Sequence, residues 1–121
     1  MRTPKLITNY SPLNDGELAN MASRTADALR DNTHFPDMVP TFEEYESTAL
    51  DYITKQAITA AARPNTQQAR EKDEARERLI VMMRRVTNYI NSFTQVSSIQ
   101  LSSGFVELLH LTGDFFRRYI S

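Results

Sequence analysis

Residues 66–93 carry the clearest hydrophobic pattern in the chain. The segment begins as a dense mixture of charges and continues, without any glycine or proline, into apolar positions spaced three or four residues apart. These positions are Leu79, Met82, Met83, Val86, Ile90 and Phe93. Such spacing is typical of one face of an amphipathic helix, and Asn65 with Gln68 offers a capping box at its start. The segment is therefore predicted to be one long helix whose second half organises the core.

Two further helices are marked by their start signals. Each start has the spacing of a capping box, in which the side chain of each residue accepts a hydrogen bond from the backbone amide of the other. The pairs are Asn14 with Glu17 and Thr41 with Glu44. The predicted apolar faces are Leu18, Met21, Ala22, Thr25 and Leu29 in the first helix, and Phe42, Tyr45, Ala49, Tyr52, Ile53 and Ala60 in the second. The alanine-rich end of the second helix, residues 57–62, is expected to allow close approach of another helix.

The segments outside these helices are less regular. Pro4 and Pro12 interrupt residues 1–13, which are predicted to form an extended arm that packs on a neighbour or stays mobile. After the long helix, Ser97 or Ser98 is expected to cap a short helical turn.

The C-terminal part begins with a predicted turn. Gly104 is expected to end the short helix in left-handed geometry, with Phe105 making an apolar contact behind it. Residues 106–121 form an apolar and aromatic tail that has two interpretations. Its apolar positions fit a helix, which we favour, whereas the turn signal at residues 112–114 between two apolar runs fits a hairpin.

Together these elements predict an all-α fold. We expect an antiparallel bundle of three to four helices at residues 14–105, preceded by the arm at 1–13 and followed by the tail at 106–121. A length of 121 residues suits one domain. The chain has no run of about 18 apolar residues and no apolar segment of signal-peptide length at its start. A soluble protein is expected, in the cytoplasm of the producing cell or in a virion, without membrane association.

The charge balance limits the choice of partners. The formal net charge is -1, and residues 1–63 carry 6 basic and 9 acidic side chains while the remainder carry 8 and 6. A chain built to neutralise phosphates needs a positive excess, so nucleic acid is not the expected partner. The charged half of the long helix is predicted to be a solvated surface, with Arg70–Glu74 and Glu74–Arg78 pairs one helical turn apart.

Residue types that carry catalytic or metal-binding chemistry do not converge in the sequence. The chain has no cysteine, and His34 and His110 are far apart without a second ligand at helical spacing. The acidic residues Glu43, Glu44 and Glu46 suit the positive end of a helix dipole. We therefore expect no enzymatic activity, no metal and no cofactor.

Two arginine doublets are the remaining candidates for a binding site. One is Arg84-Arg85, and the other is Arg117-Arg118, which is flanked by aromatic residues. Arginine and aromatic side chains are enriched at protein interfaces, although they can also stack on bases or anchor to anionic surfaces. We favour contact with a partner protein over packing within the chain and over nucleic-acid binding. The candidate partner interface consists of Phe115, Phe116, Arg117, Arg118, Tyr119 and Ile120.

Several short motifs follow one another in an order that resembles a known group of proteins. They are Asn14-Asp15-Gly16-Glu17-Leu18, Phe35-Pro36, Tyr89-Ile90 and Leu101-Ser102-Ser103-Gly104-Phe105. Over residues 14–105 this order resembles small helical proteins of Bacteroides-type bacteria and their phages. In those, an antiparallel helical domain ends in a Ser-Gly-Phe turn and often leads into a fibronectin-type β domain. The chain departs from this pattern after Phe105, because the remaining residues are too few for such a β domain. The resemblance implies no catalytic residues.

These observations favour one function and leave an alternative. The preferred hypothesis is a non-enzymatic helical module that binds other proteins, as a homo-oligomer or as a repeated component of a larger assembly such as a phage particle. The alternative is a small nucleic-acid-associated regulatory protein that uses Arg84-Arg85 or Arg117-Arg118.

Overall fold

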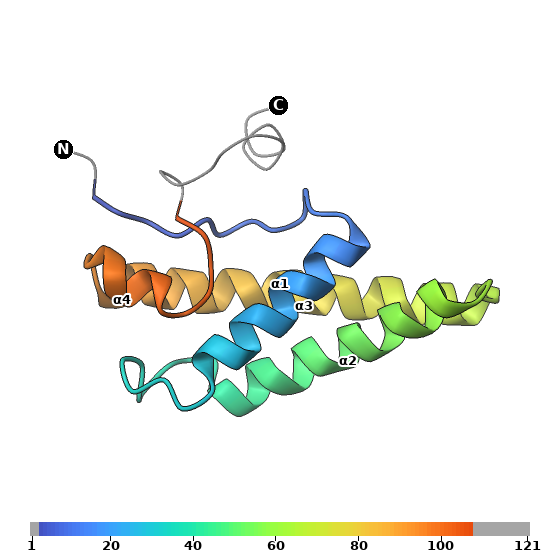
Figure 1. Cartoon of the computed structure of the whole chain (residues 1–121), viewed down its shortest axis with the longest axis horizontal. Coiled ribbons are helices and arrows are strands. Elements are labelled where there is room, and N and C mark those ends of the chain that lie inside the picture. The colour runs from blue at the N-terminus through green and yellow to red at the C-terminus, as the bar shows by residue number, and fades with distance from the viewer. Residues whose placement is uncertain (1–2, 108–121) are drawn as a thin grey trace.

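Four helices make up most of the described chain (Figure 1). The computed structural model describes residues 3–107, with α1 at Asp15–Leu29, α2 at Phe42–Ala61, α3 at Thr66–Phe93 and α4 at Ser97–Leu101. α2 and α3 form an antiparallel hairpin, and α1 packs on α2 and lies across the pair. The predicted all-α bundle is confirmed. No helix within residues 3–107 combines the length and apolar content needed to cross a membrane.

Side chains cap α1 and α3 as predicted. At α1, the Asn14 side chain accepts the Glu17 amide at 2.8 Å, and the Glu17 carboxylate accepts the Asn14 amide at 3.0 Å. Asn65 and Gln68 make the same reciprocal pair at the start of α3. Because each box satisfies amides that have no partner inside the helix, both helices begin at the residue the sequence indicates.

The starts of α2 and α4 differ from the prediction. The Thr41 hydroxyl accepts the Glu44 amide at 3.2 Å, but the reciprocal half of this capping box is not formed. The prediction that Ser97 or Ser98 caps α4 is wrong, since Val96 precedes the helix and provides no side-chain cap. The Ser97 hydroxyl donates instead to a carboxylate that follows α4.

The second half of α3 forms the centre of the core. Its residues Leu79, Met83, Val86 and Ile90 are buried under α1, α2 and the arm. Two positions of the predicted apolar faces are exposed: Phe93, of which 50% is exposed, and Ala60. Phe93 is the last residue of α3 and Ala60 lies in the last turn of α2, so both fall beyond the region that α1 covers. The alanine-rich end of α2 is likewise exposed.

The N-terminal arm belongs to the same core. Leu6, Ile7, Tyr10 and Leu13 are buried, so of the two predicted states the arm is packed, and the neighbour on which residues 3–13 pack is the chain's own bundle. The Asn91 side chain of α3 accepts the Leu6 amide at 2.8 Å and donates to the Leu6 carbonyl at 3.1 Å. This amide group provides both hydrogen bonds that a neighbouring strand would otherwise supply.

The turn after α4 closes the bundle as the sequence predicts. Gly104 has a φ of 86°, and the ring of Phe105 is fully buried. Phe105 lies between Tyr10 of the arm, with ring centroids 5.6 Å apart, and Tyr45 of α2, at 6.0 Å. One aromatic side chain therefore joins the arm, the C-terminal turn and α2. The choice between helix and hairpin for the tail concerns residues 108–121, which lie outside the described part of the chain.

Candidate functional site

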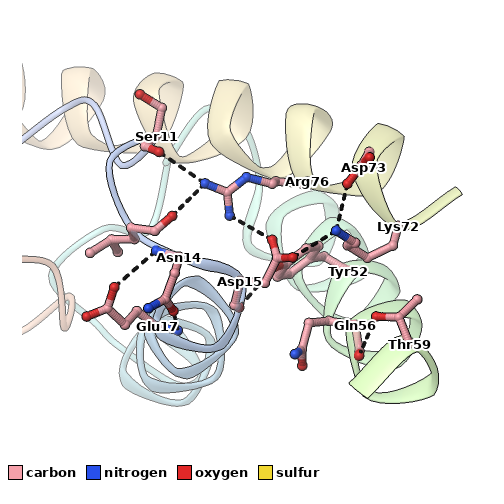
Figure 2. A network of polar contacts seen from close by, with 11 residues as sticks. Ser11, Asn14, Asp15, Glu17, Tyr52, Gln56, Thr59, Lys72, Asp73 and Arg76 are labelled. Carbon is pink, nitrogen blue, oxygen red and sulfur yellow. Dashed lines mark hydrogen bonds and ion pairs between the residues drawn. The ribbon is translucent and has the colours of Figure 1, made fainter. Parts of the chain in front are cut away.

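A cluster of charged side chains surrounds Asp15, the first residue of α1 (Figure 2). Its carboxylate accepts the ammonium of Lys72 at 2.8 Å and a guanidinium nitrogen of Arg76 at 3.1 Å. The Tyr52 hydroxyl of α2 lies 3.1 Å from the same carboxylate and 2.9 Å from the Asp15 carbonyl oxygen. One acidic residue thus links three helices, and we call this group the Asp15 cluster.

The guanidinium of Arg76 extends the cluster to the arm. Its other terminal nitrogen donates to the carbonyl of Ser11 at 3.0 Å and to that of Leu13 at 2.6 Å (Figure 2). Lys72 has a second partner in Asp73, at 2.7 Å. Arg76 therefore satisfies backbone carbonyls at the end of the arm while it neutralises the carboxylate at the start of α1.

The cluster sets the protonation state of its members. Burial raises the pKa of Asp15, but hydrogen bonds from Lys72 and Tyr52 and the nearby positive charges outweigh burial and lower that pKa. The hydrogen bond to Asp15 and the contact with Asp73 raise the pKa of Lys72. Burial and the charge of Asp15 raise the pKa of Tyr52 to about 12. These shifts keep Asp15 and Lys72 charged and Tyr52 neutral at neutral pH, which suits a structural tether better than acid–base catalysis, where a pKa near the working pH is needed.

The sequence did not reveal this cluster. It indicated that the charged half of α3 is a solvated surface with Arg70–Glu74 and Glu74–Arg78 pairs. These three residues are exposed, but within residues 3–107 neither pair is formed, and the expectation of a solvated surface is wrong for Lys72 and Arg76. Arg78 instead lies 3.3 Å from Asp51 of α2, while two other cations of this half hold the start of α1. Partners that lie 57 or 61 positions away have no short-range signature.

A second polar cluster joins the arm to α4. The buried Gln100 side chain donates to the carbonyls of Pro4 and Thr94 at 3.0 and 2.9 Å. The Ser97 hydroxyl donates to the buried carboxylate of Glu107 at 2.6 Å. These contacts hold both ends of the described chain against the C-terminal end of α3, so their role is structural.

An exposed apolar surface lies where α3 meets α4. Phe93, Val96 and Leu101 are 50%, 51% and 39% exposed, and we call these three residues the apolar end. The ring of Phe93 stacks on Tyr89 at 5.7 Å and meets the edge of Phe35 at 5.8 Å. Phe93 therefore connects the apolar end to aromatic side chains that are partly or fully buried.

The loop that contributes Phe35 also forms a pocket. It has a volume of about 410 Å³ and lies between the end of α1 and the start of α2, and we call it the loop pocket. Apolar side chains from both helices and the loop line it: Leu29, Phe35, Met38 and Phe42. Asp31 and Glu43 also line the pocket and are exposed. Its size falls at the lower end of the range for ligand sites, roughly 300–1,000 Å³.

The structure places the residues singled out in the sequence in different environments. Arg84 and Arg85 are exposed on α3, and His34 is exposed in the loop before α2. Within residues 3–107, no group of three or more His, Asp or Glu side chains is arranged to hold a metal ion. His110 and the predicted interface at residues 115–120 lie outside the described range.

Comparison with protein-family models, curated proteins and solved structures gave no match.

Proposed function

We propose that this protein is a non-enzymatic helical module that binds protein partners. It acts as a homo-oligomer or as a repeated component of a larger assembly, such as the phage particle that the sequence resemblance suggests. The observation that carries the proposal is the apolar end, where Phe93, Val96 and Leu101 are all exposed within nine consecutive residues. Single exposed apolar side chains are ordinary, whereas a group of them on one surface is typical of a protein interface.

The apolar end is carried by a well-fixed part of the fold. The side-chain amide of Asn32, just after α1, donates to the carbonyl and the hydroxyl of Ser102, each at 3.2 Å. Phe93 is held by its ring contacts with Tyr89 and Phe35. A surface that is already ordered loses little conformational freedom on binding, which favours association.

Self-association tests the proposal directly. We expect the full chain to show a concentration-dependent increase in mass by sedimentation velocity and light scattering. Val96→Ser should weaken that association because it removes apolar area from the apolar end. Val81→Ser is the matched control, since Val81 is 52% exposed on α3 outside the apolar end. A chain that stays monomeric at every concentration, with no other protein bound, would rule the proposal out.

Nucleic-acid binding is the second candidate, and the exposure of Arg84 and Arg85 favours it. Binding through these side chains should weaken steeply with salt, because each phosphate contact releases counterions. Replacing both arginines with glutamine should then abolish a gel shift seen at low salt. No shift of the wild-type chain at low salt would remove this candidate.

A further inference from the structure

The loop pocket combines an apolar floor with an open, charged edge. Leu29, Phe35 and Met38 line it and are almost fully buried, and Phe42 beside them is half-buried, so the apolar part of the lining is held in place by the core. Asp31 and Glu43 are exposed and neither has an ion pair within residues 3–107. The pocket therefore fits a ligand that presents an aromatic or aliphatic group together with a positive charge.

The surroundings of the pocket reinforce this charge preference. Residues 27–46 contain six acidic side chains and one arginine, although the whole chain has a net charge of only -1. That arginine, Arg30, also lines the pocket, but its charge is engaged by Glu46 at 2.9 Å and by Asp27 at 3.4 Å. α1, whose C-terminal end borders the pocket, has no basic residue in its last turn. The negative end of its dipole adds to the attraction for a cation.

The chain itself contains a segment with the complementary chemistry. Residues 115–120 place two adjacent arginines between aromatic and aliphatic side chains, and residues 108–121 contain two arginines and one acidic residue. We propose that the loop pocket binds residues 115–120 of a neighbouring copy of the chain, with an aromatic ring on the apolar floor and arginine beside Asp31 and Glu43. This inference rests on the proposed assembly function and names the two surfaces that meet.

The described chain ends across α3 and α4 from the loop pocket, so a tail would have to pass around its own bundle to reach the pocket of the same molecule. The Ile7 amide donates to the Val106 carbonyl at 2.8 Å, and Leu6 and Glu107 form an antiparallel bridge. At that point the chain runs along the arm, toward the N-terminus. Figure 1 shows the arm and the loop between α1 and α2 on opposite sides of α3 and α4. A pocket on one copy and a tail on the next form a heterologous contact, which builds rings or extended arrays.

Complementary variants of the full chain test this contact. Glu43→Lys disables the pocket but keeps the tail, whereas the double variant Arg117→Glu/Arg118→Glu disables the tail but keeps the pocket. Each variant alone should associate about tenfold more weakly than the wild type, because an opposed charge pair becomes a like-charge pair. An equimolar mixture should regain association by sedimentation velocity, since the unchanged tail of one variant meets the unchanged pocket of the other, and the two reversed sites are also opposite in charge. Glu74→Lys, with the same charge change on the exposed surface of α3, should leave association unchanged.

The outcomes separate this inference from the proposed function. Thermal melting followed by circular dichroism establishes that each variant is folded, and Glu43→Gln serves as a milder pocket variant. If Glu43→Lys and Glu43→Gln associate as strongly as the wild type while Val96→Ser does not, the pocket assignment is wrong and the assembly proposal stands. A mixture of the two charge variants that stays monomeric also overturns the inference, as does a tail cross-linked to the pocket of its own molecule. A monomeric wild type overturns both proposals.

Discussion

Asp15 and Lys72 are 57 positions apart in the sequence and joined by an ion pair of 2.8 Å. The pair connects the first residue of α1 to the charged half of α3, and Arg76 extends the connection to the arm. Because Lys72 and Arg76 are only 15% and 17% exposed, these contacts are shielded from solvent more than ordinary surface pairs. The charged half of α3 thus contributes to the fold as well as to solubility.

Replacing Asp15 with asparagine should destabilise the protein by about 1–2 kcal/mol, because the partly buried Arg76 loses its carboxylate partner and Lys72 loses one of its two. Urea denaturation at neutral pH measures this change. Asp73→Asn is the matched control, since Asp73 contacts the same lysine at 2.7 Å but is 66% exposed. Asp73→Asn should lower the free energy of unfolding by less than about 0.5 kcal/mol. Equal costs for the two variants would show that the Asp15 cluster is not a specific tether.

The same carboxylate should make stability depend on acidity. The pKa of Asp15 is lowered in the folded protein, so its contribution is present above the ordinary value of 3.8 and is lost as the pH falls through the folded pKa. The difference in unfolding free energy between wild type and Asp15→Asn should therefore shrink between about pH 6 and about pH 3. Denaturant titrations across this range measure it. A difference that stays constant with pH would mean that the charge of Asp15 contributes nothing.

Gly104 should not tolerate a side chain. Its φ is 86°, and a Cβ atom there would lie 3.1 Å from the Ala28 Cβ and 3.2 Å from the Arg24 carbonyl oxygen. Gly104→Ala is expected to destabilise the protein by about 2 kcal/mol or more, from left-handed strain and crowding together. At Gly16 in α1 the nearest atom to such a Cβ is 3.7 Å away, so Gly16→Ala should be neutral or stabilise by up to about 1 kcal/mol. Similar melting temperatures for the two variants would contradict this expectation.

The arm should detach from α3 when its amide tether is removed. Asn91→Ala deletes both hydrogen bonds to Leu6, at a cost of about 1–2 kcal/mol. Hydrogen exchange at the Leu6 amide should become markedly faster, because its acceptor is gone. Asn88→Ala changes an exposed asparagine on the same helix and should alter neither stability nor exchange. If the Leu6 amide exchanges as slowly in Asn91→Ala as in the wild type, burial of apolar side chains alone holds the arm on α3.

Most of the helical architecture could be predicted from local signals. The long helix begins at Thr66 and ends at Phe93, the bounds that its apolar spacing and the Asn65 cap indicate. The left-handed turn at Gly104 and the burial of Phe105 were predicted from a short motif. These signals work because capping, helical periodicity and glycine geometry involve residues within a few positions of one another.

Of the candidate binding surfaces, one was found in the sequence and two were found only in the structure. Residues 115–120 come from the sequence alone, since arginines among aromatic side chains are visible without any structure. The loop pocket and the apolar end could not be predicted, because each depends on how far α1 covers its neighbours. Phe93 illustrates this difference: its spacing matches the buried face of α3, yet it lies at the helix end and half of its surface is exposed.

The sequence by itself therefore determined the three long helices, the residues at which they begin, and the closing turn. Only the tertiary structure decided that the arm packs on its own bundle and that Asp15 selects Lys72 and Arg76 as partners. The physical reason is the separation along the chain between the residues that interact. Helix formation depends on contacts between neighbours in the chain, whereas a charge has many partners of similar energy along the sequence and finds its own only after the helices have packed.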